Sequence, residues 1–190
     1  IISNYSLSES EGKQVERAVA KIEKRGPDAE GIKSYGSSIL GHRRLSIIDI
    51  NPASVQPMED ATERYSIVFN GEIYNHKTLK SDLTAKGYVF KNESDTEVLL
   101  NGYDFYGTAF LNKLNGFFAF VIYDKKEKTT LVVRDRFGIK PLLFYKKENA
   151  FYFASEMKAL LEYDIPREID HTSLYTYLQL NYVPEPHSMI

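Results

Sequence analysis

Three short polar segments of this 190-residue chain carry groups that could bind and cleave a free amino acid. Arg44 follows a β-rich run, and its planar guanidinium can hold a carboxylate through two hydrogen bonds. Asp95 offers a counter-charge for an α-ammonium group. Asn70 offers a side-chain amide, and Gly71 offers a backbone N–H that a ligand can approach closely because glycine has no Cβ. Two such donors can stabilise an oxyanion, so the segments together predict an acyl-transfer site.

Each of these residues also has an ordinary structural explanation. Asn-Gly is the commonest hairpin signal, so Asn70 and Gly71 alone indicate a turn at the end of a strand. An isolated Arg44 is most often a solvated charge on an edge strand, and an isolated Asp95 is most often an acid at a helix start. Only the combination favours function, because the three segments supply complementary groups for one ligand.

The composition predicts one globular domain and excludes several kinds of partner. Apolar residues make up 43% of the chain, which is enough for a substantial core. The formal charge is −2, with 24 basic and 26 acidic residues mixed along the chain, so we expect no nucleic acid and no anionic membrane as partner. The longest apolar run, residues 117–123, is far shorter than the ~20 residues that cross a bilayer. We therefore expect a soluble protein.

Residues that hold metals or nucleotides are missing or unsuitably spaced. The chain has no cysteine, which excludes thiolate metal sites, and its four histidines do not fall at ligand spacing. The segment from Gly138 to Pro141 lacks the spacing of a phosphate-binding loop. We therefore expect no metal and no cofactor in this domain.

Capping signals and apolar spacing predict several helices. A capping box at residues 8–11 precedes Val15, Val19 and Ile22, which predicts a one-faced helix that ends near residues 25–27. Leu79 and Leu83 before Gly87 predict a second helix with a glycine at its C-terminal end. A second capping box at residues 94–97 predicts a third, and a further helix is expected from about residue 172 to residue 180.

Runs of β-branched and aromatic residues joined by turn residues predict antiparallel sheets. Residues 31–48 and 65–74 indicate strands and turns, and residues 117–124, 129–134, 142–146 and 150–154 predict hairpins of a second sheet. The run 117–123 is apolar at every position, which indicates a strand covered on both faces. We therefore predict a layered α+β domain over residues 1–162, with helices outside the sheets. Residues 163–190 have no apolar partner segment and are interpreted as a linker and the start of a further domain.

Eight sequence blocks resemble class II glutamine amidotransferases and occur in the same order. They are residues 25–28 (RGPD), 42–49 (HRRLSIID), 56–58 (QPM), 70–75 (NGEIYN), 94–97 (SDTE), 114–120 (LNGFFAF), 134–142 (RDRFGIKPL) and 153–159 (FASEMKA). The match covers almost the whole chain. Within that class, the HxRLSI and NGEIYN wordings and the tail at residues 182–186 are most similar to glutamine-hydrolysing asparagine synthetases.

This resemblance implies an N-terminal-nucleophile hydrolase fold, a four-layer αββα sandwich of two antiparallel sheets between helical layers. It makes Arg44 the holder of the glutamine α-carboxylate and gives the α-ammonium to Asp95 and Glu72. Asn70 and Gly71 would form the oxyanion hole. Four further residues would line the pocket, through backbone groups: Leu45, Ser46, Ile47 and Ile48.

Three prominent arginines in the matched blocks are interpreted as structural. Arg25, Arg134 and Arg136 are expected to hold loops in place through ion pairs or carbonyl contacts.

The nucleophile of the class is a cysteine at the first position of the mature chain, whose own α-amine is the general base. Because the family pattern Cys-Gly-Ile-x-Gly runs into a strand like Ile1-Ile2, we expect this cysteine roughly five or six residues upstream of Ile1.

Without that cysteine, the chain should bind glutamine but not hydrolyse it. Two alternatives remain open at this point: a glutamine-binding sensor or scaffold that lacks a nucleophile, and an unrelated α+β domain with a fortuitous match. For the complete protein, the resemblance implies that ammonia from glutamine passes to a synthetase domain of the same polypeptide, which uses ATP and magnesium to activate aspartate. It also implies a cytoplasmic location and a homodimer. Paralogues with the same front domain can aminate other carboxylates, so the ammonia acceptor stays open.

Overall fold

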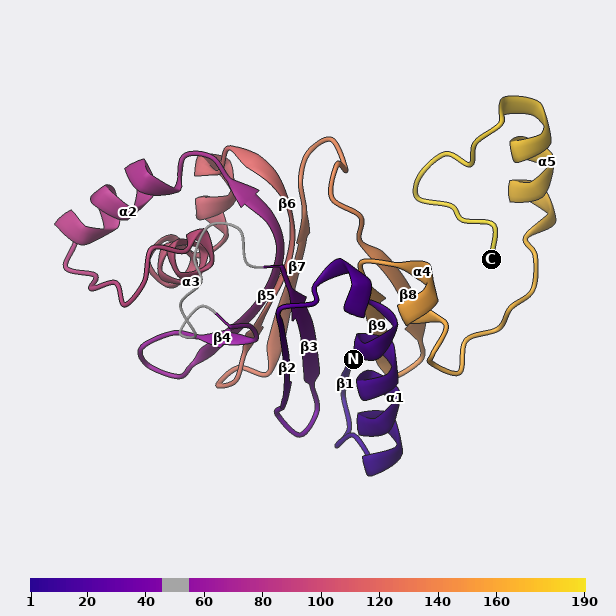
Figure 1. The fold of residues 1–190 in the computed structure, drawn as a ribbon, viewed down its shortest axis with the longest axis horizontal. Helices are drawn as coiled ribbons and strands as arrows, with labels where there is room; N and C mark the ends of the chain where they lie inside the picture. Colours follow the sequence, from indigo (N-terminus) through magenta and orange to yellow (C-terminus); the bar gives the residue numbers. More distant parts are fainter. Residues whose placement is uncertain (46–54) are drawn as a thin grey trace.

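The computed structural model describes residues 1–45 and 55–190. Two antiparallel sheets stack face to face in the middle of the molecule, as Figure 1 shows, and helices lie on both sides of them. The residues of the candidate site come from both sheets, so the order of the strands decides which of them meet.

The first sheet combines two hairpins with the N-terminal strand. β2 (Ala29–Ser34) pairs with β3 (Ile39–Arg44), and β8 (Leu143–Lys147) pairs with β9 (Ala150–Ala154). β1 (Ile2–Ser3) pairs with β9, and an isolated bridge joins it to the residue before β3. The order β8-β9-β1-β3-β2 therefore places the first residues of the chain in the middle of this sheet.

The second sheet has the order β4-β5-β6-β7. Its strands are β4 (Met58–Glu59), β5 (Tyr65–Ile73), β6 (Gly116–Asp124) and β7 (Thr129–Arg134). β5 and β6 pair along their whole length, whereas β4 pairs only with the first part of β5. Among the described residues, the later part of that edge of β5 has no strand beside it. Asn70 and Gly71 lie on this open part.

Helices cover the outer face of each sheet (Figure 1). α1 (Glu9–Lys21) and the short α4 (Met157–Leu160) pack on the first sheet. α2 (His76–Ala85), α3 (Asp95–Tyr106) and the 3-10 helix η3 (Gly107–Lys113) cover the second sheet. The four-layer αββα sandwich expected from the sequence is therefore confirmed.

Alternation along the strands separates the core between the sheets from the cores under the helices. On β6, Phe120 and Ile122 face the helices of the second sheet, whereas Val121 and Tyr123 face the first sheet. The fully apolar run is thus buried on both faces, as predicted. On β3, Leu40 is fully buried and joins the core between the sheets.

The predicted helix-start signals are present, one completely and one in part. Ser8 accepts a hydrogen bond from the backbone of Glu11, whose carboxylate accepts one from the backbone of Ser8 at 2.7 Å. At α3, Ser94 accepts from the backbone N–H of Glu97 at 3.3 Å, but the Glu97 carboxylate binds backbone N–H groups upstream of Ser94. The second box is therefore only half formed. A 3-10 turn, η1 (Glu23–Arg25), follows α1.

The prediction that the four later strand runs share a second sheet is wrong. β6 and β7 join β5, whereas β8 and β9 join β1 at the other end of the chain. Each hairpin is specified by its own turn, but the strand that it pairs with lies far away in the sequence. Turn signals therefore predict hairpins without predicting the sheets to which they belong.

The chain leaves the sandwich after α4. The predicted last helix is present as α5 (His171–Leu180), which begins at the N-cap Asp170 and has Ser173 as its buried residue. In Figure 1 it stands apart from both sheets. The boundary expected at residue 162 stays a prediction. Across residues 1–45 and 55–190, no helix has the length and apolar content needed to cross a bilayer.

Candidate active site

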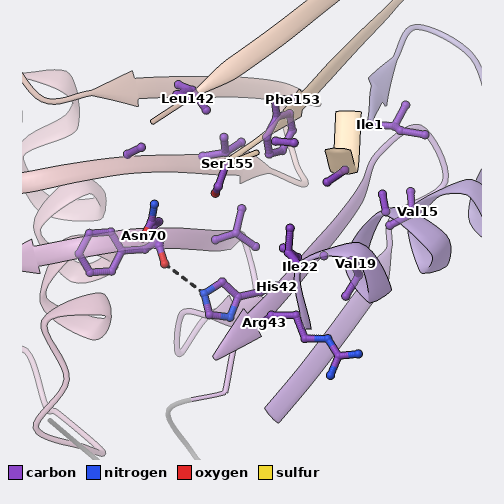
Figure 2. A pocket seen from close by; sticks show the side chains of 18 of the residues that line it. Ile1, Val15, Val19, Ile22, His42, Arg43, Asn70, Leu142, Phe153 and Ser155 are labelled. Carbon is purple, nitrogen blue, oxygen red and sulfur yellow. Dashed lines mark hydrogen bonds between the residues drawn. The ribbon is translucent and has the colours of Figure 1, made fainter. Parts of the chain in front are cut away.

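The first sheet has a gap where β1 ends. β3 and β9 continue past Ile1 on either side, and a cavity of about 110 Å³ occupies this place. Side chains from both sheets and from α1 line it, as Figure 2 shows. His42, Asn70 and Ser155 are among the polar ones, and Phe153 is one of the apolar ones. The cavity therefore connects the core under α1 with the space between the sheets.

The strand register defines what this gap could hold. Ile1 and Ile39 exchange two backbone hydrogen bonds of 2.9 Å, so they lie opposite each other. In an antiparallel ladder, each step back along one strand is a step forward along its neighbour. Arg44 follows Ile39 by five residues at the end of β3. A strand residue five places before Ile1 would therefore lie opposite Arg44.

Asn70 projects into this cavity from β5. Its Oδ1 accepts a hydrogen bond of 3.3 Å from Nη2 of Arg25, and Arg25 is itself paired with Glu156 at 3.3 Å. A guanidinium can only donate, so it selects the amide orientation in which oxygen faces it. Nδ2 of Asn70 therefore points elsewhere; it is buried and has no hydrogen-bond partner among the described residues. Asn70 presents an unused donor inside the cavity.

Gly71 is part of a strand and not of a turn. β5 continues through it to Ile73, with Gly71 opposite Phe118 of β6, so the hairpin explanation of Asn-Gly is wrong here. A Cβ on Gly71 would overlap the carbonyl oxygen of Phe117 and come within 2.8 Å of Cα of Phe118. Glycine is required at this position by the close approach of β6, in addition to any approach of a ligand.

The N–H of Gly71 points to the open edge of β5. Phe118 directs its own polar groups towards Asp135 and not towards β5. On the same edge of β5, the N–H of Phe69 donates to Oε1 of Gln56 at 2.6 Å, and the N–H of Ile73 donates to Oδ2 of Asp95 at 3.0 Å. Alternate residues of a strand share an edge, so Gly71 lies between two side-chain-bound N–H groups. Asn70 and Gly71 thus place two donors next to each other.

Of the residues expected to bind the amino-acid end of glutamine, Asp95 contacts this edge, and the others that are described lie on or next to β3 and β5. Asp95, the first residue of α3, is buried, and burial raises the pKa of its carboxyl group. Arg44 and Leu45 follow each other at the end of β3, and the Leu45 side chain is 53% exposed. Glu72 is exposed on β5. Ser46, Ile47 and Ile48 lie outside the described residues. The binding roles of all these residues stay predictions.

His42 is a site residue to which the sequence interpretation gave no role. Its Nε2 donates to the backbone carbonyl of Phe69 at 3.2 Å, as the dashed line in Figure 2 shows. Burial, reinforced by the charge of Arg44, lowers the pKa of His42 to about 4. The ring is therefore neutral at physiological pH with its proton on Nε2. Its place in the matched HRRLSIID block was the available signal.

Two of the three arginines interpreted as structural make contacts of the expected kinds, and the role of Arg136 stays a prediction. Arg134 donates to the carbonyl oxygens of Lys140 at 2.8 Å and Gly138 at 2.6 Å, so the prediction for this residue is confirmed. Arg25 forms its ion pair with Glu156 but also contacts Asn70, which links it to the site.

Comparison with known proteins identifies the family of this chain. The family model for the glutamine amidotransferase domain matches residues 1–190. Asparagine synthetase [glutamine-hydrolyzing] 1 of Bacillus subtilis is 44% identical over 165 residues, covering 87% of this chain and 26% of that protein. Asparagine synthetase B [glutamine-hydrolyzing] of Escherichia coli is 44% identical over 138 residues, covering 72% of this chain and 24% of that protein. The chain thus spans about a quarter of the length of these curated relatives.

A solved structure supports the fold. The glutamine phosphoribosylpyrophosphate amidotransferase from B. subtilis, complexed with ADP and GMP, superposes with a TM-score of 0.56 at 29% sequence identity. The superposition covers 65% of this chain and 29% of that one. By sequence and by fold, the chain belongs to the glutamine amidotransferase domain family.

Proposed function

We propose that this chain is the glutaminase domain of a glutamine-dependent asparagine synthetase, which hydrolyses glutamine to glutamate and ammonia. The observation that carries the proposal is the pair of donors at Asn70 and Gly71. Nδ2 of Asn70 is buried without a described partner, and a buried donor left unpaired costs roughly 1–3 kcal/mol. A site that forms an oxyanion during the reaction gives this donor its partner in the transition state.

The nucleophile would be a cysteine upstream of Ile1 in the complete protein. In strand geometry, a residue five places before Ile1 would lie opposite Arg44, at the end of the gap between β3 and β9. That position agrees with the spacing expected from the family pattern. It would bring the thiol towards the cavity that Asn70 lines, beside the end of β3 where Arg44 lies.

The reaction would then follow acyl-transfer chemistry. The cysteine α-amine takes the thiol proton, and the thiolate attacks the side-chain carbonyl carbon of glutamine. Asn70 and Gly71 stabilise the negative charge that develops on the carbonyl oxygen. The C–N bond breaks, ammonia leaves with the transferred proton, and a thioester remains. Water attacks the thioester, which releases glutamate and restores the thiol.

Recognition of glutamine would depend on its amino-acid end. Arg44 would pair with the α-carboxylate, a charge-assisted contact that contributes roughly 1.5–3 kcal/mol when shielded from water. Asp95 and Glu72 would receive the α-ammonium. Oδ2 of Asp95 accepts from the N–H of Ile73, and a carboxylate has further acceptor sites that would serve the ligand. Leu45 and residues 46–48 would complete the wall through backbone groups.

The other activities of the complete protein belong to this proposal as well. Ammonia would pass to a synthetase domain that uses ATP and magnesium to activate aspartate. A cytoplasmic location and a homodimer accompany the same proposal. The ammonia transfer, the location and the homodimer are supported by the resemblance to the asparagine synthetases and by the 44% sequence identity to two of them.

Substitution of Asn70 in the full-length protein tests this function. Removal of one oxyanion donor typically costs about 2.7–4 kcal/mol of transition-state stabilisation, so Asn70→Ala should lower kcat by about two to three orders of magnitude with a small change in KM. A glutaminase rate within twofold of the parent would contradict the assignment. N-terminal sequencing of the mature protein is the second test, because it shows whether the nucleophilic cysteine is present. A first residue other than cysteine would favour a glutamine-binding sensor or scaffold.

A further inference from the structure

The peptide groups just before the oxyanion pair are held by side chains instead of by a strand. The N–H of Phe69 donates to Oε1 of Gln56 at 2.6 Å, and its carbonyl accepts from Nε2 of His42 at 3.2 Å. Gln56 comes from the segment before β4, and His42 comes from β3 of the opposite sheet. Both polar groups of the residue that precedes Asn70 are therefore fixed from outside β5.

Gln56 makes a second bond that reaches the helix of the proposed ammonium site. Its Nε2 donates to Oγ1 of Thr96 at 3.3 Å, and both side chains are buried. Thr96 follows Asp95, which binds the N–H of Ile73 at 3.0 Å. The start of α3 is thus tied to β5 at two points, one on each side of Gly71.

We propose that Gln56 and His42 are positioning residues for the oxyanion pair Asn70 and Gly71. This inference rests on the proposed glutaminase function and adds two residues to it. The carbonyl of Phe69 and the N–H of Asn70 belong to one peptide plane, so a shift of that carbonyl turns the backbone that carries both donors. Displacement of a catalytic group by about 1 Å can cost on the order of 10²-fold in rate.

The chemistry of the two side chains fits this role. An amide side chain can accept and donate at the same time, as Gln56 does between Phe69 and Thr96. Both groups stand where a charge would be costly, because Gln56 is 6% exposed and burial keeps His42 neutral. Neutral side chains hold the strand in place without adding a net charge beside the developing oxyanion.

Steady-state glutamine hydrolysis by variants of the full-length protein tests the proposal. Gln56→Met removes both hydrogen bonds at similar volume, and we expect kcat to fall at least tenfold with KM within threefold. Gln56→Asn keeps a neutral amide donor and acceptor at shorter reach, so this variant should recover part of kcat relative to Gln56→Met. His42→Gln keeps a donor near the position of Nε2 and should lose less rate than His42→Leu.

Ser66→Ala provides the matched control. Ser66 is a buried polar residue of the same strand, and its hydroxyl is 2.7 Å from that of Tyr35, away from the open edge. The melting temperature of each variant is measured alongside the rate. Ser66→Ala should lower the melting temperature with little change in kcat.

The inference is overturned if Gln56→Met lowers kcat no more than Ser66→Ala does at a similar loss of melting temperature. It is also overturned if KM rises while kcat stays unchanged, because that result indicates a loss of glutamine binding and not of transition-state stabilisation. A parent protein without glutaminase activity would instead overturn the proposed function, and this inference with it. If Gln56→Met does not fold, the inference is tested by the kcat values of His42→Gln and His42→Leu. Equal kcat values for these two variants would then overturn it.

Discussion

Nη2 of Arg25 lies 3.3 Å from Oδ1 of Asn70, and this contact fixes the orientation of the amide. Glu156 pairs with the same guanidinium at 3.3 Å, so Arg25 is held between an acid on the α4 side and the amide on β5. The pairing turns Nδ2 of Asn70 away from the cation. Arg25 is therefore more than one half of an ion pair with Glu156. It determines that Nδ2 of Asn70, and not Oδ1, is available to a ligand.

Arg25→Met should lower glutamine turnover while leaving glutamine binding nearly unchanged. A hydrogen bond to a charged group contributes roughly 1.5–3 kcal/mol, so a loss of about tenfold or more in kcat is expected in the full-length protein. Arg25→Lys should recover part of the rate. Arg17→Met is the control, because Arg17 pairs with Glu162 at 3.4 Å without reaching the site. Equal rates for the two methionine variants would contradict the orienting role.

Gly71→Ala should destabilise the domain strongly, whatever its effect on catalysis. Its Cβ would collide with backbone atoms of Phe117 and Phe118, which cannot move without opening β6. We expect a loss of about 3 kcal/mol or more in the free energy of unfolding, at the upper end of overpacking effects. Gly12→Ala is the control: no atom lies within 4 Å of its Cβ position in α1, so helix propensity should stabilise the protein by about 0.5–1 kcal/mol. Urea denaturation of the 190-residue chain measures both.

Arg44 should distinguish glutamine from an analogue that lacks the α-carboxylate. We expect the analogue to bind about tenfold or more weakly, since the charge-assisted pair is worth roughly 1.5–3 kcal/mol. In Arg44→Met the two ligands should bind with similar affinity, because the group that discriminates between them is gone. Isothermal titration calorimetry gives both dissociation constants. Equal affinity in the parent protein would remove Arg44 from its assigned role.

His42 should make the stability of the domain fall with pH below neutrality. In the unfolded chain His42 takes up a proton near its ordinary pKa of 6.5, whereas in the folded protein the ring stays neutral down to about pH 4. The stabilisation is therefore complete above about pH 6.5 and decreases towards pH 4, by up to about 3 kcal/mol.

His42→Gln lacks this proton linkage and isolates it from the carboxylates that titrate in the same range. The difference in unfolding free energy between the parent and His42→Gln, followed by urea denaturation, should shrink by about 2–3 kcal/mol from pH 7.5 to pH 4.5. A constant difference between parent and His42→Gln would contradict burial of a neutral ring.

Local signals predicted most of the elements, because their causes are local. The Ser8 capping box and the apolar spacing after it specify α1. The uninterrupted apolar run of β6 indicates burial on both faces and hence the sandwich. The blocks that resemble the family contain Asn70, Gly71 and Asp95, and the structure brings these three to one edge of β5.

Features that depend on distant contacts could not be predicted in the same way. The strand that continues through Gly71 is set by pairing with β6, about 45 residues away, and not by the turn preference of Asn-Gly. The roles of Gln56 and His42 arise where segments from two sheets meet around Phe69. Neither residue stands out by spacing, because the groups of Phe69 that they bind are backbone atoms, which leave no mark in the sequence.

The central position of β1 has a consequence for synthesis on the ribosome. Ile2 pairs with Phe151 in the first sheet, so β1 is made 149 residues before the strand β9 that pairs with it. At roughly 5–20 residues per second, β9 is made on the order of 7–30 s after β1. Until then β2 and β3 can pair, but the side of β3 that will receive β1 and β9 stays incomplete. The first sheet of the nascent domain can therefore be completed only after β9 has been made.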